Sequence, residues 1–255
     1  MTLKALIFDV DGTLADTEKD GHRVAFNMAF KDAGLDWDWD DDLYGQLLAV
    51  TGGKERIRYY LEQFNSAFIK PDNFTEFVAK LHAAKTQFYM QLMEQGQVPL
   101  RVGVEQLFKQ AREQGLRLAI ATTTTPENVT ALLHNTMGKG SEQWFEVIAA
   151  GDIVPAKKPA ADIFVYALQK LNLSAQECLA FEDSENGLKS SKGAGLKTVI
   201  TINDYTKDQD FSNADLILDQ FGDSNNPFKV IDNKALKLDD FSFFNIELAK
   251  LIIGN

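Results

Sequence analysis

The chain has 255 residues, of which 45% are hydrophobic and 25% are charged. This balance is typical of a globular protein with a substantial core and excludes disorder as the dominant state. The formal net charge of -11 argues against a general nucleic-acid or anionic-membrane surface, because like charges repel at long range. Cys178 is the single cysteine, so an intramolecular disulfide and a multi-cysteine metal site are excluded.

An apolar run begins at Ala5, within a few residues of Met1, and no apolar run in the sequence reaches membrane-spanning length. We therefore expect no signal or transit peptide and a cytoplasmic location, although a processed precursor would give the same sequence. We also expect a monomer.

Five short apolar runs, each followed by turn residues, predict buried strands at 5–10, 116–121, 147–150, 178–181 and 198–201. Helix-length stretches lie among them at 104–114, 126–135, 161–171 and 186–194. This alternation predicts an α/β fold with a Rossmann-like, doubly wound parallel sheet. Such a sheet binds its ligands at the carboxyl ends of the strands.

The sequence between the first and second strands is long and has no strand pattern. Helical stretches are predicted at 22–33, 54–64 and 74–93, and apolar residues such as Phe77, Leu81, Phe88 and Leu92 recur near helical spacing. We therefore expect an inserted all-helical cap domain at 17–96 and a core domain at 1–16 and 97–255. Beyond the fifth strand, 214–218 predicts an edge strand and 241–253 a closing helix.

The strongest motif is Asp9-Val10-Asp11-Gly12-Thr13-Leu14, directly after the first strand. Side chains alternate along a strand, so Asp9 and Asp11 are expected to point the same way. Two crowded carboxylates repel unless a cation or a proton lies between them, and Gly12 permits a sharp turn close to a ligand. The arrangement suits magnesium and phosphate, although Asp-Gly alone is also a common turn pair.

Three further polar motifs follow predicted strands or turns. Thr122 opens a run of four threonines, of which Thr125 before Pro126 fits a helix N-cap. Lys158 precedes Pro159 and could offset phosphate charge, although paired lysines before a proline are commonly a solvated turn. Glu182-Asp183-Ser184 offers oxygen ligands for magnesium, or a cap for the next helix.

The Asp9 motif and these three motifs, in this order along the chain, resemble the motifs of the haloacid dehalogenase superfamily. The resemblance is to the branch whose helical cap follows the first motif. The resemblance extends from Asp9 to about Gly195. It implies that Asp9 is the nucleophile and that Asp11 is the general acid and base. A dehalogenase lacks the second aspartate, so halide release is disfavoured.

The resemblance also implies the ligands. Mg²⁺ would be held by Asp9, the backbone carbonyl of Asp11 and Asp183, with support from Glu182. Phosphate would be positioned by Thr122, by Lys158 and by backbone amides near Gly12 and Thr123.

The cap segment Thr51-Gly52-Gly53-Lys54-Glu55-Arg56 combines glycines, exposed amides at a helix start and two cations. Such a segment could clamp a second anionic group through Gly53 and Lys54, or Thr51 could simply cap a helix. Together with Gly34-Leu35-Asp36-Trp37, it is similar to the CbbY-type phosphatases of carbon-fixing organisms, which hydrolyse xylulose-1,5-bisphosphate, a misfire inhibitor of Rubisco. Glu18 and His22 are candidates to face the sugar hydroxyls, although His22 could equally lie on a helix surface.

The predicted function is therefore a Mg²⁺-dependent sugar-phosphate phosphatase. One alternative is a sugar-phosphate mutase of the β-phosphoglucomutase type, whose motifs and cap are nearly the same. Another is a non-catalytic phosphate-binding module, which the intact Asp9, Asp11, Lys158 and Asp183 argue against.

Overall fold

The computed structural model describes residues 2–96, 98–234 and 236–254. Its sheet has the strand order β3-β2-β1-β4-β5-β6-β7, with all neighbours parallel except the antiparallel pair β6 and β7. The strands are β1 (Ala5–Phe8), β2 (Arg117–Ala121), β3 (Phe145–Ala149), β4 (Cys178–Glu182), β5 (Lys197–Thr201), β6 (Leu216–Leu218) and β7 (Val230–Asp232). The predicted α/β class and parallel sheet are confirmed; β7 was missed because its residues are all exposed and carry no core pattern.

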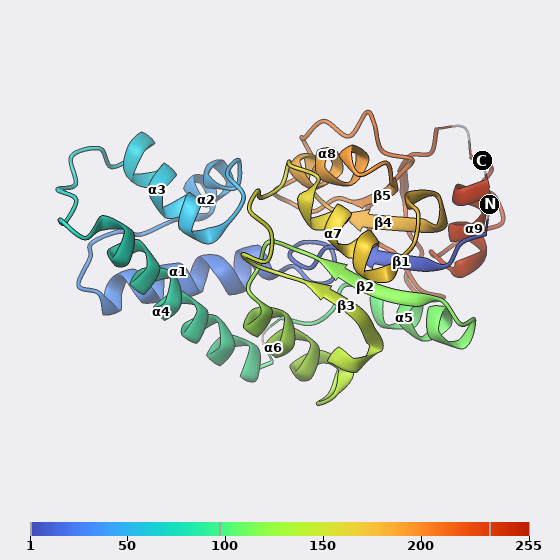
Figure 1. Cartoon of the computed structure of the whole chain (residues 1–255), viewed down its shortest axis with the longest axis horizontal. Helices are drawn as coiled ribbons and strands as arrows, with labels where there is room; N and C mark the ends of the chain where they lie inside the picture. The colour runs from blue at the N-terminus through green and yellow to red at the C-terminus, as the bar shows by residue number, and fades with distance from the viewer. Residues whose placement is uncertain (1, 97, 235, 255) are drawn as a thin grey trace.

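The strands are apolar because the sheet is covered on both faces, as Figure 1 shows for the core. Along β1, Leu6 and Phe8 pack into one hydrophobic cluster, and Ala5 and Ile7 pack into another on the opposite face. The first face carries α5 (Val104–Glu113), α6 (Pro126–Met137) and α9 (Ile246–Gly254), and the second carries α7 (Asp162–Leu171) and α8 (Glu185–Gly193). The short turns η2 (Ser141–Trp144) and η3 (Ala175–Glu177) precede β3 and β4.

Between β1 and α5 the described residues form helices and no named strand. These are η1 (Glu18–Arg23), α1 (Val24–Asp32), α2 (Asp41–Leu47), α3 (Gly53–Gln63) and α4 (Phe74–Glu94). They form the separate lobe seen beside the sheet in Figure 1, with a core of aromatic residues that includes Trp37, Trp39 and Tyr44. The inserted helical cap is thus confirmed, whereas its proposed limits at 17 and 96 stay a prediction.

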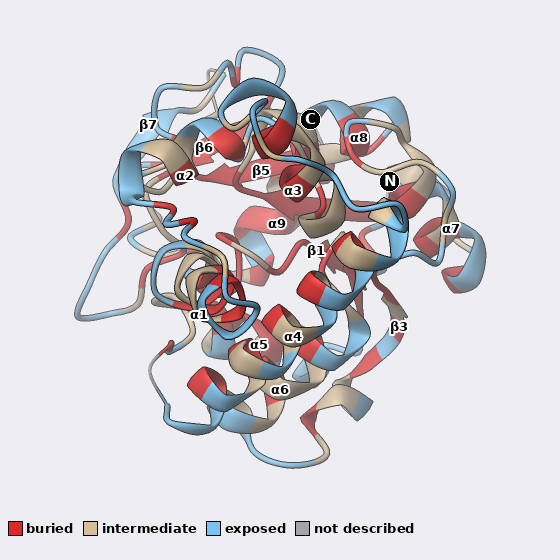
Figure 2. Ribbon diagram, turned by 90° about the vertical axis from the view of Figure 1, so that its left-hand side faces the viewer, coloured by how far each residue is buried: buried red, intermediate tan, exposed pale blue. Residues whose placement is uncertain are grey.

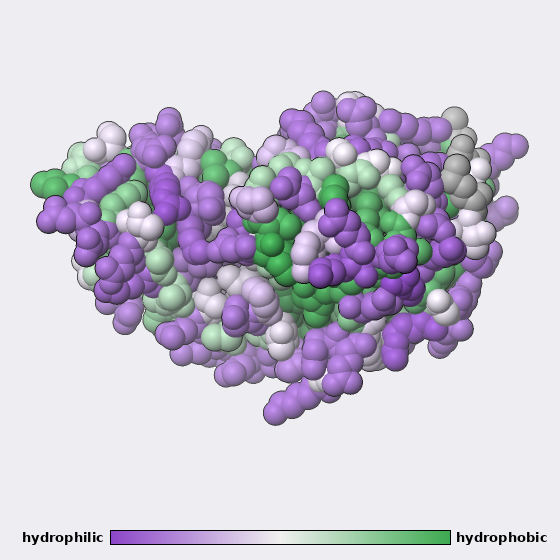
Figure 3. All heavy atoms as spheres, viewed as in Figure 1, coloured by the Kyte–Doolittle hydropathy of each residue, from purple (hydrophilic) through white to green (hydrophobic). Residues whose placement is uncertain are grey.

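The two chain connections between the lobes run side by side, because Ala15 and Leu100 form an antiparallel bridge. Figure 2 shows buried positions concentrated in the strands and on the inward faces of the surrounding helices. Figure 3 shows a largely hydrophilic surface with a notch between the lobes. In the part of the chain that the structure describes, no helix combines the length and apolar character needed to cross a membrane.

Candidate active site

A cavity of about 400 Å³ opens between the carboxyl ends of the strands and the cap. Its lining includes most of the core residues predicted from the sequence, which are Asp9, Asp11, Thr122, Thr123, Lys158 and Asp183. These residues come from four separated segments and meet because parallel strands end at the same edge of the sheet. The cap side of the cavity includes Glu18 and Arg56.

Asp9 follows β1 directly and is held at the strand end by its backbone N–H, which donates to Phe181 O at 3.0 Å. Lys158 donates from Nζ to Asp9 Oδ1 at 2.5 Å and also bonds the Glu182 carboxylate. All three side chains are buried. Burial alone would lower the pKa of Lys158, but the charges of Asp9 and Glu182 outweigh it and raise that pKa, so the ammonium stays charged.

The carboxylates of Asp9, Glu182 and Asp183 offer oxygen atoms that all lie within 4.8 Å of one another. Burial, followed by the charges of neighbouring carboxylates, raises the pKa of Asp183. Burial and Asp9 likewise raise the pKa of Glu182 to about 8, against the opposing effect of Lys158. Buried carboxylates that repel one another in this way are a fitting donor set for a divalent cation, which would remove the repulsion.

Gly12 has a positive φ of 82°, and its lack of a side chain is required by the site. A Cβ atom there would lie 2.2 Å from Asp183 Oδ2 and 2.8 Å from Asn203 Nδ2. The turn therefore brings the Asp9–Asp11 loop against Asp183, and Gly12 itself lines a second, neighbouring cavity of about 510 Å³.

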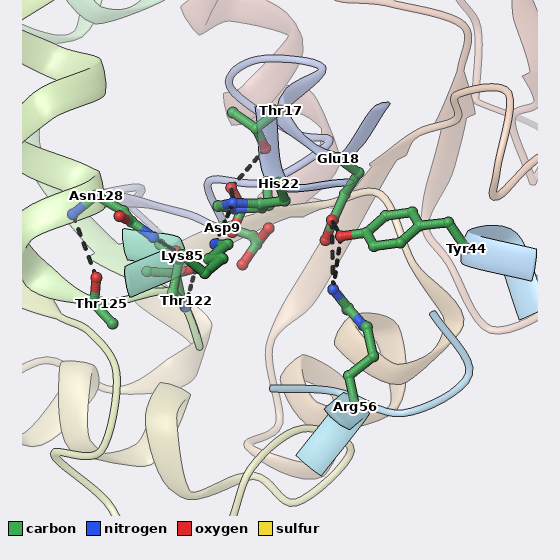
Figure 4. Close-up of polar contacts among 12 residues, drawn as sticks. Asp9, Thr17, Glu18, His22, Tyr44, Arg56, Lys85, Thr122, Thr125 and Asn128 are labelled. Carbon is green, nitrogen blue, oxygen red and sulfur yellow. Dashed lines mark hydrogen bonds and ion pairs between the residues drawn. The ribbon is translucent and has the colours of Figure 1, made fainter. Parts of the chain in front are cut away.

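Asp11 lies within a chain of polar contacts that begins in the core and ends in the cap, of which Figure 4 labels Thr17, His22 and Lys85. Thr17 Oγ1 donates to Asp11 Oδ1 at 2.6 Å, and His22 Nε2 lies 2.7 Å from the same oxygen. Lys85 Nζ, on α4, lies 2.6 Å from His22 Nδ1. Burial would raise the pKa of Asp11, but His22 and Thr17 outweigh it and lower that pKa, so Asp11 is a carboxylate here.

η1 is a π-helical turn, a feature often found at functional sites. Its Glu18 lines the 400 Å³ cavity, whereas its His22 lines a smaller cavity of about 40 Å³. Gly21 within η1 lies against α4, since a Cβ there would come within 3.0 Å of the Tyr89 ring. Figure 4 shows Glu18, Tyr44 and Arg56 converging. Arg56 Nη1 donates to the Tyr44 hydroxyl at 2.8 Å, and this hydroxyl bonds Glu18. The sequence left open whether His22 lies on a helix surface; in the structure its side chain is buried.

The glycine-rich cap segment divides between two environments. Lys54 Nζ pairs with Asp152 of the core at 2.6 Å, outside the 400 Å³ cavity, and Gly53 lies against the His82 ring. Thr51 does not cap α3, whose N-cap is Gly52; its Oγ1 instead accepts from Asn186 Nδ2 at 3.2 Å. The helix-capping readings of Thr125 and Ser184 are confirmed, since both hydroxyls accept backbone N–H groups.

Four residues at the site were not singled out from the sequence: Tyr44, Lys85, Arg101 and Asn203. Asn203 Nδ2 donates to Asp183 Oδ2 at 2.8 Å. Asn203 lies just beyond the end of β5, as Asp9, Thr122 and Asp183 lie just beyond the ends of other strands. Its position after a predicted strand could therefore have identified it from the sequence. Lys85 carried no such signal, because it lies within the regular pattern of α4.

Residues 3–195 match the family described as haloacid dehalogenase-like hydrolase. Protein CbbY of Rhodobacter capsulatus is 53% identical over 84% of this chain and 92% of that protein. CbbY from Rhodobacter sphaeroides, solved in complex with phosphate, superposes with a TM-score of 0.80 at 44% identity over 87% of this chain and 96% of that one. A mutant of the same protein, solved in complex with xylulose-1,5-bisphosphate, superposes with a TM-score of 0.80 at 43% identity, over 87% of this chain and 96% of that one.

A β-phosphoglucomutase from Clostridium difficile superposes with a TM-score of 0.67 at 20% identity, over 86% of this chain and 92% of that one, which shows a shared fold only. The family match spans residues 3–195 and so covers the positions of Asp9, Thr122, Lys158 and Asp183 as well as the helical cap. The chain therefore belongs to the haloacid dehalogenase-like hydrolases, in their CbbY group, and is an enzyme.

Proposed function

We propose that the chain is a Mg²⁺-dependent phosphatase that hydrolyses a small sugar bisphosphate, xylulose-1,5-bisphosphate, through an aspartyl phosphate on Asp9. The observation that carries this proposal is the meeting of Asp9, Thr122, Lys158 and Asp183 in one cavity, opposite a buried cap cation, Arg56. The CbbY structure with xylulose-1,5-bisphosphate supports the substrate, because its protein is 43% identical to this chain.

The transfer step begins with Asp9 attacking the phosphorus atom, which forms the aspartyl phosphate and breaks the bond to the sugar oxygen. Lys158 offsets the negative charge of Asp9 and of the phosphoryl oxygens, and Thr122 lies beside them to donate a hydrogen bond. Asp11 gives its proton to the leaving sugar oxygen. An anionic phosphate beside Asp11 raises the pKa of that carboxyl, which favours the protonated form this step requires.

Hydrolysis returns the enzyme to its starting state. Asp11, now a carboxylate, accepts a proton from the water that attacks the aspartyl phosphate, and inorganic phosphate leaves. Asp9, Asp183 and the Asp11 carbonyl would hold Mg²⁺, with Glu182 behind them, and the ion would supply positive charge against the phosphoryl group.

The substrate's second phosphate would lie against the cap. Arg56 has an Nε atom without a hydrogen-bond partner in the described structure, and its side chain is buried in the cavity wall. Glu18 and Tyr44 beside it would face the sugar hydroxyls. A buried guanidinium beside oxygen acceptors suits a sugar that carries a distal anion.

Replacing Asp9 tests the covalent route. Asp9→Asn removes the nucleophile and should lower phosphate release by at least about 1,000-fold, while the variant stays folded and still binds Mg²⁺. Phosphate release from xylulose-1,5-bisphosphate is measured for both proteins, with circular dichroism as the folding control. Turnover near the wild-type rate would exclude the aspartyl phosphate.

The β-phosphoglucomutase alternative differs in the acceptor of the phosphoryl group, which is a sugar hydroxyl instead of water. Measuring inorganic phosphate and isomerised sugar phosphate in the same reaction separates the two. Formation of isomer without phosphate release would overturn the phosphatase proposal. A phosphate-binding module without catalysis would bind the bisphosphate and produce neither.

A further inference from the structure

Arg101 is a buried arginine that contacts neither the cavity residue Asp9 nor Asp183 directly. It lies on the connection that returns from the cap to the core, and its side chain is only 8% exposed. A guanidinium taken out of water needs acceptors for its five N–H groups. The acceptors that Arg101 finds are backbone carbonyls at the active-site end of the sheet.

These carbonyls belong to three different segments of the core. Nη1 donates to Gly12 O in the catalytic loop and to Thr201 O, at the end of β5, at 3.1 Å. Nη2 donates to Ile202 O at 2.6 Å and to Asp219 O, just beyond β6, at 2.7 Å. One planar group thus joins the loop after β1 to the loops after β5 and β6.

The joined loops are those that meet at Asp183. Gly12 lies against Asp183 and Asn203 so closely that no side chain fits between them. Asn203 follows Ile202 and donates to Asp183 Oδ2 at 2.8 Å. The position of Asp183 relative to Asp9 therefore depends on two loops that Arg101 holds together.

Arg101 also anchors the cap connection. Its backbone N–H donates to Leu14 O at 2.8 Å, and Leu100 before it bridges to Ala15. Nε lies 3.6 Å from Asp16 Oδ1 on the opposite connection. The same residue therefore holds both connections and the catalytic loop.

We propose that Arg101 is a positioning residue, which aligns the Asp9 loop with Asn203 and Asp183 so that their oxygens bind Mg²⁺ together. The inference rests on the Mg²⁺ site of the proposed function. It makes a counter-intuitive prediction, because a cation near a metal site should by charge alone weaken metal binding. If Arg101 acts through its hydrogen bonds, removing it weakens Mg²⁺ binding despite the loss of that repulsion.

The test measures Mg²⁺ binding to the whole protein by isothermal titration calorimetry, without substrate. Arg101→Met removes both charge and hydrogen bonds, and Arg101→Lys keeps the charge but loses the planar fork. We expect the dissociation constant to rise at least about tenfold in Arg101→Met, with a smaller rise in Arg101→Lys. Arg117→Met is the matched control, since Arg117 pairs with Glu146 in the core and should leave the constant unchanged.

Arg101→Met removes donors from buried carbonyls, so the Arg101→Lys variant keeps the test valid if Arg101→Met does not fold. Asn203→Ala, alone and combined with Arg101→Lys, provides a double-mutant cycle. If Arg101 acts through the Asn203 loop, the double variant should bind Mg²⁺ more tightly than the product of the two single effects predicts.

Two outcomes would overturn the inference. One is Arg101→Lys with wild-type Mg²⁺ affinity and only a lower melting temperature, and the other is tighter binding by Arg101→Met. Asp183→Asn separates these from failure of the proposed function, because the wild-type protein must bind Mg²⁺ and Asp183→Asn must bind it more weakly. Equal binding by the wild type and Asp183→Asn would refute the metal site itself.

Discussion

Lys54 and Arg56 are two residues apart, yet their side chains lie in different environments. The Arg56 side chain is 8% exposed and lines the active-site cavity, whereas Lys54 is 35% exposed and pairs with Asp152 of the core. The difference follows from the helix, because residues two apart point to different faces. The sequence analysis assigned the anion clamp to Gly53 and Lys54, whereas in the structure it is Arg56 that lines the cavity.

This difference predicts distinct kinetic effects. Arg56→Lys should raise KM for a sugar bisphosphate by about tenfold more than for the corresponding monophosphate, because a bidentate charged contact to the distal phosphate is lost. Lys54→Ala should show the same selectivity only if Lys54 also reaches that phosphate, as the sequence predicts. Steady-state kinetics on paired mono- and bisphosphates measure this, and an equal change on both by Arg56→Lys would contradict the role of Arg56.

At the scale of the single residue, strand ends were predictable and helix interiors were not. Asp9, Thr122 and Asp183 each follow an apolar strand, so their convergence could be expected from the sheet rule alone. Lys85 and Tyr44 lie in helices of the cap, where only packing shows which face meets the core. Lys85 is buried against His22, and burial lowers the pKa of its ammonium to about 8.

Among the elements, α4 connects the cap's interior to the active site. It contributes Lys85 to the polar chain that ends at Asp11 and His82 to the contact with Gly53. Burial, followed by the positive charges of Lys85 and Lys54, lowers the pKa of His82 to about 3. The folded protein therefore keeps this imidazole neutral in mildly acidic solution.

The low pKa of His82 predicts a contribution to acid sensitivity. Between pH 6.5 and 5 the unfolded chain takes up a proton at His82 that the native protein does not, so stability falls as the pH falls. His82→Gln removes this group and should reduce the loss of unfolding free energy across that range by at most about 2 kcal/mol. Urea unfolding of both proteins at pH 6.5 and pH 5 measures the effect.

The control for this experiment is His134→Gln. His134 lies on α6 and pairs with Glu142, and it is 31% exposed, so this variant reports what a histidine-to-glutamine replacement does at a partly exposed site of the core domain. Identical pH dependence in the wild type and His82→Gln would show that the folded protein does protonate His82.

For the whole molecule, the arrangement of cap and core rests on apolar packing of α4 against α6 and on a few polar contacts between the lobes. Asp152 of the core accepts from Lys54 of the cap and from Lys157 of the core, each at 2.6 Å. Asn186 donates to Thr51, and the Tyr205 hydroxyl lies 3.0 Å from Asp41 Oδ1. These contacts lie at or beside the cavity, so they favour the arrangement in which cap and core residues meet there.

Loosening one contact should shift the cap without unfolding the protein. Asp152→Asn weakens the pairing with Lys54 and should raise KM about threefold while changing the free energy of unfolding by less than about 1 kcal/mol, since exposed ion pairs contribute little. KM and thermal unfolding are measured together. The control is Glu146→Gln, which weakens the solvent-exposed ion pair of Glu146 with Arg117, both in the core domain. An unchanged KM in Asp152→Asn would show that this contact does not influence substrate binding.

Local sequence determined strands β1 to β6, the main helices of the core and the catalytic motifs, because buried strands need continuous apolar runs and strand ends place polar residues at one edge. β1 and the Asp9–Leu14 segment that follows it are the clearest example. Local sequence did not indicate the exposed strand β7. The family resemblance added the expected chemical roles of Asp9 and Asp11.

Only the tertiary structure decided which cap side chains reach the cavity and what aligns the core loops. Arg101 and Asn203 act through contacts with residues about 100 and 20 positions away, and no periodicity in the sequence records such pairs. The physical reason is that periodic patterns report which side of an element is buried, whereas the partner on that side depends on how separate elements pack together.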